Sequence, residues 1–262
     1  MGWQDLRDGN PVKERLAAGG TVVGSFVRMS SVEVTEASAH AGCDFVIIDA
    51  EHAPATWAQQ SAMIIAAEAA GTVPILRVSN WSRDLITRAL DAGAHGVMVP
   101  QIETTEAAEA AVAATHYGPG GTRGVAANRR SGYGLKMSYP EYVEASNRST
   151  LVALQVETMA AVERVDEIAE VPGIDCLFVG LADLSTDLGI AGAWDDPALV
   201  DYVERINAAC RRNEIAFGLP VPNGDLARYW MERGARFVAT GDIGVFANAM
   251  KAFIEEVRGF SD

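Results

Sequence analysis

The chain has 262 residues, of which 49% are hydrophobic, and 35 acidic residues against 21 basic ones give it a formal charge of −14. This length and apolar content suit one large α/β barrel domain. The acidic balance argues against a nucleic acid or an anionic membrane as partner, since both need basic surfaces, and no apolar run approaches the ~18 residues of a membrane span. A small acidic substrate stays open, because a few local arginines can override the global sign.

The N-terminal stretch and the cysteines indicate a cytoplasmic protein. Residues 1–16 are amphipathic and charged, without the apolar segment of a secretory signal. The cysteines, Cys43, Cys176 and Cys210, show no metal-type spacing. An odd number of cysteines without a disulfide framework predicts reduced thiols.

Short apolar runs alternate with helix-like stretches along the chain. A strand of a parallel sheet is buried on both faces and therefore reads as a continuous apolar run. The runs that fit are 21–26, 44–49, 73–78, 95–100, 151–157, 176–180, 215–220 and 236–241. These repeated units predict a (β/α)8 TIM barrel over a single domain, residues 1–262, in preference to a doubly wound sheet.

Residues 117–150 interrupt this rhythm. They are rich in glycine and contain no apolar run longer than the segment RGVA. We expect a glycine-rich loop inserted between the fourth and fifth strands. Loops of this length inside compact domains are usually functional.

Ionisable side chains follow the second and third predicted strands. Asp49 ends the run FVIID, Glu51 and His52 come directly after it, and the third run contains Arg77. In a barrel the chemistry gathers at the C-terminal ends of the strands, so we expect a base and a cation to meet there. Each also has a structural interpretation, His52 as a loop residue and Arg77 as the partner of a surface acid. The other histidines are predicted to be structural: His40, His95 and His116.

Oxygen donors follow the fifth and sixth strands. Gln155 and Glu157 end the fifth run, and Asp183 lies in GLADLS at the start of a helix. Glu157 and Asp183 have no His or Cys beside them, so they suit a hard cation such as Mg²⁺ or Mn²⁺. The backbone N–H groups of Ala182 and Asp183 would attract a carboxylate. The structural alternative is that both acids cap helices.

Several segments together resemble the HpcH/HpaI family of metal-dependent pyruvate aldolases. They lie between Thr21 and Val245 and read FVIIDAEHAP, ILRV, LDAGAHGVMVPQIET, YGPGGTRGV, LVALQVET and LFVGLADLSTDLG. The resemblance implies a barrel of the phosphoenolpyruvate/pyruvate type and a homo-hexamer, a trimer of dimers with an exchanged terminal helix. It also implies a lyase that forms a pyruvate enolate and adds it reversibly to an aldehyde, which cleaves 4-hydroxy-2-oxo acids in the reverse direction.

The resemblance assigns roles in proton transfer and metal binding. His52 would be the catalytic base that acts on the pyruvate methyl group, and Arg77 would contact the oxo group and stabilise the enolate. Glu157 and Asp183 would bind the divalent metal, Mg²⁺, Mn²⁺ or Co²⁺. Asp91, in LDAGA, would raise the basicity of His52, although it precedes the fourth predicted strand.

The resemblance also outlines the substrate pocket. Gln155 would line it, and the N–H groups of Ala182 and Asp183 would hold the pyruvate carboxylate. The chain departs from the family at Leu181, where Pro is usual, and at 26–28, where Phe-Val-Arg replaces Trp-Leu-Gly. Phe26 and Arg28 therefore predict an altered aldehyde pocket, in which Arg28 favours aldehydes that carry a carboxylate. The aldehyde itself stays open.

Four other functions compete with this interpretation. An acyl-CoA lyase of the same superfamily would need a basic nucleotide groove, which the acidic sequence does not suggest. A decarboxylase or citrate-forming enzyme acting on oxaloacetate would use the same enolate, with Arg28, Arg129 and Arg130 as further anion ligands. A phosphate-binding isomerase would be opposed by Asp225 and Asp242, and a barrel serving only as a scaffold would have no use for the rim residues.

Lysines are scarce and lie outside the predicted strands. The chain has three, Lys13, Lys136 and Lys251. A Schiff-base lysine must stand on a barrel strand, where burial lowers its pKa. The sequence therefore predicts a metal, and not a lysine, as the electron sink.

Overall fold

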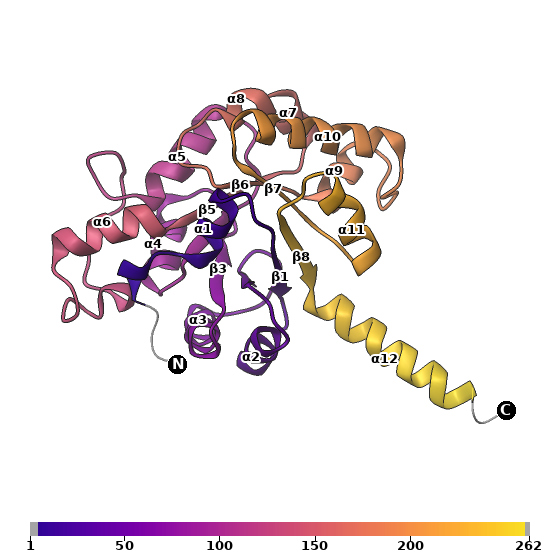
Figure 1. Ribbon diagram of the computed structural model, residues 1–262, viewed down its shortest axis with the longest axis horizontal. Coiled ribbons are helices and arrows are strands. Elements are labelled where there is room, and N and C mark those ends of the chain that lie inside the picture. The colour runs from indigo at the N-terminus through magenta and orange to yellow at the C-terminus, as the bar shows by residue number, and fades with distance from the viewer. Residues whose placement is uncertain (1–4, 260–262) are drawn as a thin grey trace.

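The strands close into a barrel. The structure, a computed structural model, describes residues 5–259. Eight parallel strands follow one another around the barrel in chain order, and β8 pairs with β1 (Figure 1). They are β1 (Val22–Val27), β2 (Phe45–Asp49), β3 (Val73–Arg77), β4 (Gly96–Val99), β5 (Leu151–Val156), β6 (Cys176–Val179), β7 (Ala216–Pro220) and β8 (Phe237–Gly241). All eight predicted strands are present, and the (β/α)8 barrel is confirmed.

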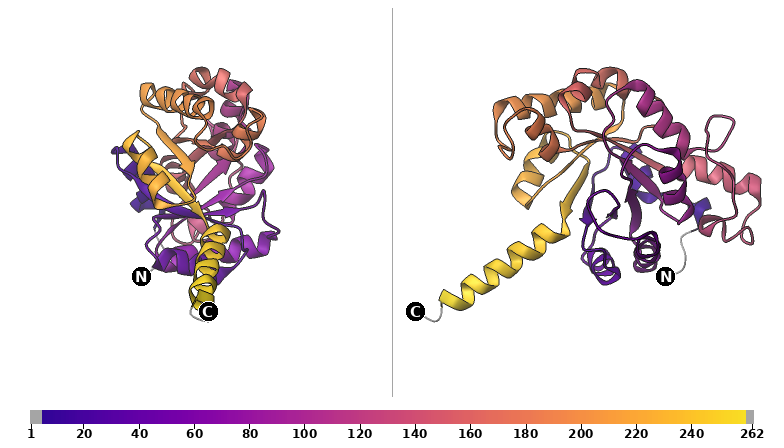
Figure 2. Two further views of the ribbon diagram at one scale, coloured as in Figure 1. Left: turned by 90° about the vertical axis from the view of Figure 1, so that its right-hand side faces the viewer. Right: turned by 180° about the vertical axis from the view of Figure 1, so that it is seen from behind.

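Helices surround the barrel and connect its strands (Figure 2). The α-helices before β5 are α1 (Pro11–Ala17), α2 (Val32–His40), α3 (Trp57–Ala70), α4 (Arg83–Asp91), α5 (Thr105–Thr115) and α6 (Tyr139–Ser149). Those after it are α7 (Met159–Glu163), α8 (Val165–Ala169), α9 (Leu181–Asp187), α10 (Pro197–Arg212), α11 (Gly224–Glu232) and α12 (Asp242–Gly259). Two short 3₁₀ helices are η1 (Leu6–Asp8) and η2 (Arg129–Ser131).

Alternation along the strands separates the barrel interior from the layer beneath the helices. Phe45 and Ile47 belong to the interior cluster, whereas Val46 and Ile48 belong to the cluster between sheet and helices. Because side chains alternate with a period of two, Asp49 continues the inward-facing set at the C-terminal end of β2. The same rule turns Arg77 and Gln155 inward at the ends of β3 and β5. The fold thus delivers polar groups to one rim of an apolar interior.

The glycine-rich segment lies at the opposite end of the barrel. Its second part is helix α6, and the remaining loop joins α5 to α6, so it belongs to the end where helices finish and strands begin. Arg123 in this loop contacts Asp91 at the last residue of α4, and Arg129 contacts Glu68 near the end of α3. The segment lies between β4 and β5 in the chain, and within one chain it lies away from the rim at which the strands end.

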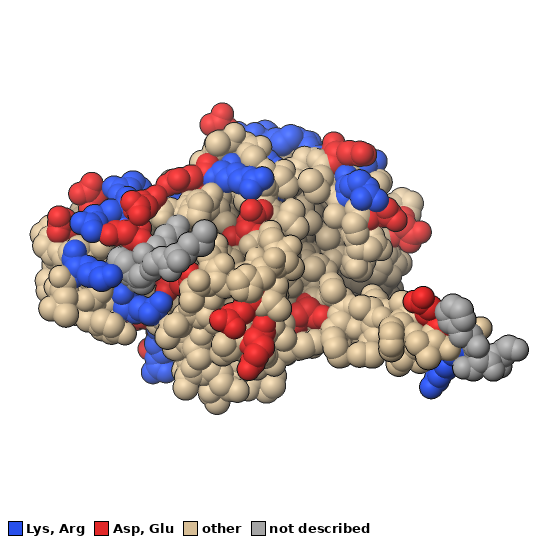
Figure 3. Space-filling view, turned by 60° about the horizontal axis from the view of Figure 1, so that its bottom comes forward, with Lys and Arg blue, Asp and Glu red and all other residues tan. Residues whose placement is uncertain are grey.

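Helix α12 leaves the barrel and extends away from it (Figures 1 and 2). Its apolar side chains are exposed, among them Phe246 at 56% and Phe253 at 63%. In Figure 3 much of the visible surface of this helix is uncharged. Within residues 5–259, no helix is long and apolar enough to cross a membrane.

Candidate active site

Arg77 and Asp49 form a buried ion pair at the rim. They are register partners on β3 and β2. Arg77 Nε donates to Asp49 Oδ1 over 3.0 Å, and Nη2 donates to Oδ2 over 2.5 Å. Burial alone would raise the pKa of Asp49, but the hydrogen bonds and charge of Arg77 outweigh it and lower that pKa. The carboxylate stays ionised and fixes the guanidinium in one orientation.

Asp49 also shapes the turn that follows β2. Its Oδ1 accepts the backbone N–H of Glu51 over 3.0 Å and that of His52 over 3.2 Å. These bonds explain why an acid ends an apolar strand here. The backbone N–H groups of Glu51 and His52 need an acceptor, and the Asp49 carboxylate supplies the one that a neighbouring strand would otherwise provide. Asp49 therefore orients the backbone that carries His52.

His52 and Arg77 both approach the carboxylate of Glu51. His52 Nε2 lies 3.7 Å from Glu51 Oε2, and Arg77 Nη1 lies 3.3 Å from the same oxygen. The His52 side chain is 56% exposed, whereas Glu51 is largely buried. Burial raises the pKa of Glu51, and the charges of Asp49 and Asp183 add to this although Arg77 opposes it. A solvent-accessible base and a fixed cation thus share one carboxylate.

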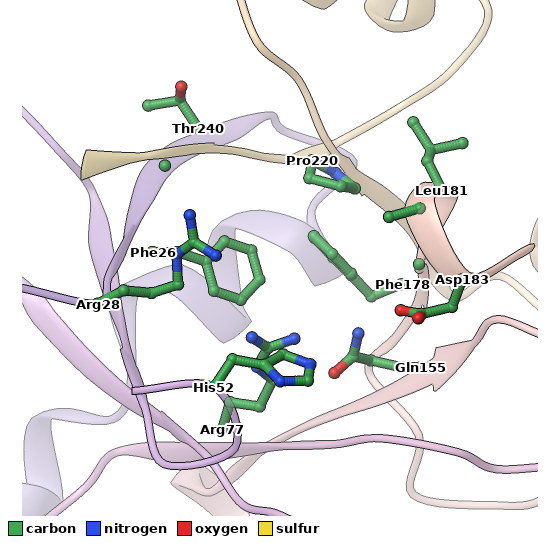
Figure 4. Close-up of a pocket in the computed structure, with 13 residues that line it drawn as sticks. Phe26, Arg28, His52, Arg77, Gln155, Phe178, Leu181, Asp183, Pro220 and Thr240 are labelled. Atoms are coloured by element: carbon green, nitrogen blue, oxygen red, sulfur yellow. The ribbon is translucent and has the colours of Figure 1, made fainter. Parts of the chain in front are cut away.

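A cavity of about 350 Å³ opens over these groups (Figure 4). That volume is at the small end of the range for small-molecule sites. Phe26 and Phe178 line its inner part, and the polar groups around it are Arg28, His52, Arg77, Gln155 and Asp183. The Arg77 guanidinium lies over the Phe26 ring, 4.9 Å from its centroid. The cavity therefore combines an apolar floor with a basic side.

Glu157 is buried just beyond the end of β5. Its Oε1 accepts the backbone N–H of Gln101 over 2.8 Å, and its Oε2 accepts Gln155 Nε2 over 3.0 Å. Gln101 adopts a left-handed backbone, with φ of 56°, to present that N–H. Burial raises the pKa of Glu157 to about 7; the Gln101 bond opposes the shift, and the charges of Asp183 and Glu51 increase it. The charge of Arg77 opposes the shift as well, but it does not cancel the effect of burial.

Asp183 lies in the first turn of α9, across from Glu157. Helix α9 begins at Leu181, and the first N–H groups of a helix have no acceptor within it. The N–H groups of Ala182 and Asp183 therefore open next to the cavity that both residues line. Between the two acids stands Gly180, whose missing side chain lets Glu157 approach.

A second cavity, of about 490 Å³, adjoins the first and shares His52 and Asp183 with it. Its lining is acidic, because Glu51, Glu103 and Glu157 join Asp183 there. One side of the rim is thus basic and the other acidic. Such a division suits an anionic substrate on one side and a cation on the other.

The acidic side fits a divalent cation only in part. Within residues 5–259, no three His, Cys, Asp or Glu side chains converge as a ready metal-ligand set. Glu157 and Asp183 nevertheless supply the oxygen donors that hard cations prefer, and mutual repulsion raises the pKa of Glu157. The Oε1 atom of Gln155 is buried and has no hydrogen-bond partner. The donor set therefore fits an ion that takes two protein carboxylates and completes its shell with water or substrate.

Asp91 does not join these residues. It is the last residue of α4, and its Oδ1 accepts Arg123 Nη2 over 2.7 Å and Asn128 Nδ2 over 2.9 Å. This network lies at the end of the barrel where the strands begin. The expectation that Asp91 raises the basicity of His52 is therefore not met within one chain, because the carboxylate beside His52 is Glu51.

Every other predicted site residue reaches the rim, and the structure adds some that were not predicted. Phe178, Pro220 and Gly241 line the cavity from the ends of β6, β7 and β8. Their positions at strand ends are a signal for them in the sequence, although their side chains carry no ionisable group. Gln101 has no comparable signal, because its contribution is a backbone N–H.

Comparisons with known proteins agree with this geometry. Residues 23–249 match the sequence profile of a family described as HpcH/HpaI aldolase/citrate lyase. Two proteins named 5-keto-4-deoxy-D-glucarate aldolase, from Shigella boydii and Klebsiella pneumoniae, are each 34% identical over 250 residues, covering 95% of this chain and 96% and 97% of theirs. A crystal structure of an HpcH/HpaI aldolase/citrate lyase family protein from Burkholderia cenocepacia is 35% identical with a TM-score of 0.90, covering 95% of this chain and 99% of that one. The citrate synthase SbnG is 29% identical with a TM-score of 0.84, covering 95% and 98%.

Proposed function

The chain belongs to the HpcH/HpaI aldolase/citrate lyase family, and we propose that its site forms a pyruvate enolate and adds it reversibly to an aldehyde. In the cleavage direction the substrate is a 4-hydroxy-2-oxo acid. This is the activity of an aldehyde-lyase, and its substrates are small molecules. The observation that carries the proposal is the pairing of a basic and an acidic cavity that share His52 and Asp183.

His52 removes a proton from the methyl group of pyruvate. Its side chain is accessible from the cavity, and imidazole is the side chain most often used as a general base. Loss of that proton moves negative charge onto the oxo oxygen. In the carbon–carbon bond-forming step the enolate carbon attacks the aldehyde carbonyl, and the alkoxide that results takes up a proton.

Arg77 stabilises the negative charge that develops on the oxo oxygen. Its guanidinium is oriented in advance by Asp49, so little reorganisation accompanies the reaction. The Nη1 atom of the Arg77 guanidinium pairs with Glu51 Oε2 over 3.3 Å, beside the cavity that Arg77 lines. Gln155 lines the same region, and its free Oε1 atom is available to substrate or water.

Glu157 and Asp183 would hold the divalent cation, Mg²⁺, Mn²⁺ or Co²⁺. When bound, the cation supplies electrophilic stabilisation of the enolate oxygen. The N–H groups of Ala182 and Asp183 are positioned to bind the pyruvate carboxylate, because helix N-termini attract anions. Phe26 and Phe178 exclude water from the inner wall of the site.

We also propose the homo-hexamer of the family, a trimer of dimers that exchange the terminal helix. The exposed apolar side chains of α12 support this assembly, because a soluble monomer rarely leaves such a stripe uncovered. They are Ile243, Val245, Phe246, Met250, Phe253, Ile254 and Val257.

Deuterium exchange into the pyruvate methyl group tests the proposal without an aldehyde. The wild type with Mg²⁺ or Mn²⁺ should catalyse the exchange. His52→Ala should slow it by about 10²–10⁴, the usual contribution of a positioned proton-transfer group. The fold should survive, since the side chain is mostly exposed.

His40→Ala is the matched control, because His40 is exposed at the end of α2, away from the rim cavities. It should exchange at the wild-type rate. Unchanged exchange in His52→Ala would remove His52 from the mechanism, and a wild type that exchanges no methyl protons would contradict the proposed enolate.

A condensing enzyme is the second candidate, favoured by the likeness to a citrate synthase. It would use the same enolate chemistry, with oxaloacetate as a substrate. Product analysis separates the two, because an aldolase forms 4-hydroxy-2-oxo acids from pyruvate and aldehydes.

A further inference from the structure

Arg28 carries its charge into the rim cavity without a partner. Its side chain extends toward the cavity beside Phe26 (Figure 4). Within residues 5–259, the guanidinium of Arg28 forms no hydrogen bond or ion pair. The bond of Arg28 to Asp242 is made by its backbone N–H. Arg77 in the same cavity is matched by Asp49 and Glu51. An unmatched cation in a cavity wall is notable in a chain with a formal charge of −14.

The backbone at Arg28 is held firmly although its guanidinium is free. The N–H groups of Arg28 and Met29 each donate to Asp242 Oδ2 over 2.9 Å. Asp242 Oδ1 accepts the N–H of Ile243 over 2.7 Å. Three backbone donors thus offset the charge of this carboxylate, and it does not pair with the guanidinium. The side chain of Arg28 starts from a fixed point between β1 and the start of α12.

Arg28 and Arg77 approach the Phe26 ring from different strands of the barrel. Arg28 is two residues beyond Phe26 along the direction of β1, which corresponds to about 7 Å of extended chain. The Arg77 guanidinium lies over the Phe26 ring. Gly241, the register partner of Phe26 on β8, leaves open space, because a Cβ atom there would meet no other heavy atom within 4 Å.

We propose that Arg28 binds a carboxylate at the far end of the aldehyde co-substrate. This inference rests on the proposed function and names the class of aldehyde that the site selects. Arg77 and the start of α9 serve pyruvate, so the second anion binds at the unpaired guanidinium of Arg28, beside Phe26. A guanidinium without an internal partner needs no rearrangement to receive a carboxylate, and such charge-assisted hydrogen bonds are strong.

A matched pair of aldehydes measures the effect. 4-Oxobutanoate and its methyl ester have the same chain length and differ in charge. The wild type should prefer the acid in kcat/KM. Arg28→Gln, which removes the charge and keeps a polar side chain, should lower kcat/KM for the acid by about 10- to 100-fold. The ester should change by less than about twofold, and Arg28→Lys should recover part of the preference.

Arg148→Gln is the control for loss of one arginine charge, because Arg148 is exposed on α6 and pairs with Glu144. It should leave the ratio of acid to ester unchanged. The inference is overturned if the wild type shows no preference for the acid, or if Arg28→Gln keeps the wild-type ratio.

Methyl exchange separates this inference from the proposed function. Arg28→Gln should exchange the pyruvate methyl protons at the wild-type rate with an unchanged KM for pyruvate. A raised KM for pyruvate with an unchanged aldehyde preference would assign Arg28 to the pyruvate carboxylate and overturn the inference. A wild type without any exchange would contradict the proposed function itself.

Discussion

Gly180 sets how closely Glu157 can approach the backbone after β6. A Cβ atom at residue 180 would lie 2.4 Å from Glu157 Oε2 and 2.6 Å from Glu157 Cβ. The backbone of Gly180 is not left-handed, since its φ is −82°. Space, and not backbone conformation, therefore requires glycine at this position.

Gly180→Ala should weaken cation binding at Glu157. The added methyl group would push the carboxylate away from its bonds to Gln101 and Gln155. We expect Mn²⁺ affinity, measured by titration calorimetry, to fall by about 10- to 100-fold, as when groups that support a ligand are disturbed. Gly244→Ala is the control, because a Cβ atom there would meet nothing within 4 Å. Equal Mn²⁺ affinity in Gly180→Ala and the wild type would exclude Glu157 as a ligand.

His95 belongs to a buried charge cluster at the far end of the barrel from the site. Its Nε2 lies 2.8 Å from Glu68 Oε1, and Glu68 also pairs with Arg129 and Arg130. Burial, reinforced by the charge of Arg130, lowers the pKa of His95 to about 4 although Glu68 opposes the shift. His95 is therefore neutral in the folded protein at neutral pH, in keeping with the predicted structural role.

The stability of the protein should fall as the pH drops below 6.5. A histidine in the unfolded chain gains its proton near pH 6.5, whereas His95 in the folded protein gains it near pH 4. The unfolded state binds more protons in this window, so His95 should cost about 2 kcal/mol of unfolding free energy between pH 7.5 and 5. Urea unfolding at both pH values measures this. His95→Gln should give a flatter dependence, and an equal slope in both proteins would contradict the shift.

At the level of elements, the strands were predictable, and the helix within the glycine-rich segment was not. Most strand residues are buried on both faces of the sheet, so an apolar run marks each strand in the sequence. The rim residues followed from strand direction alone, since Asp49, Arg77 and Gln155 stand at strand ends. Helix α6, over residues 139–149, was not predicted within the glycine-rich segment, and it leaves the rest of the loop among the starts of strands. Only tertiary contacts, such as Arg123 with Asp91, reveal that location.

Helix α12 presents an apolar stripe that its own barrel leaves uncovered. Phe246, Met250, Phe253 and Val257 recur at helical spacing, and each is at least 44% exposed. Such a stripe is typical of a helix that packs against another surface. This feature is local enough to be visible in the sequence, but its exposure depends on the direction in which the helix leaves β8.

Phe253→Glu should shift the protein toward smaller species. A charge in a buried apolar interface is costly unless it is paired. Asn248→Glu adds the same charge on the opposite side of the helix and should keep the assembly. Sedimentation velocity at one protein concentration compares the two variants with the wild type. A monomeric wild type, or equal assembly in both variants, would contradict the proposed hexamer with exchanged helices.

At the scale of the whole molecule, the two ends of the barrel have different tasks. The ionisable groups of the rim line the two cavities, whereas those of the other end pair with one another, as Glu68 does with its arginines and Asp91 with Arg123. Barrels generally place chemistry at the C-terminal ends of strands and stability at the other end. The distribution of lysines follows from the same division.

None of the three lysines stands on a barrel strand. Lys13, on α1, donates to the carbonyl of Thr150 over 2.8 Å and pairs with Asp175 over 3.0 Å, at the starts of β5 and β6. Lys136 lies in the loop before α6, at the same end. Lys251 is 73% exposed on α12. A Schiff base needs a lysine inside the barrel, where burial lowers its pKa, so the positions of these lysines are consistent with the proposed cation as the electron sink.

A chelator should therefore abolish activity, and Mg²⁺, Mn²⁺ or Co²⁺ should restore it. Borohydride added with pyruvate should neither inactivate the enzyme nor add mass to it, because no lysine forms an imine that the reagent could reduce. Activity and intact-protein mass are measured on the same samples, with borohydride alone as the control. A pyruvyl adduct on any lysine, or full activity after exhaustive chelation, would overturn the metal assignment and with it the roles of Glu157 and Asp183.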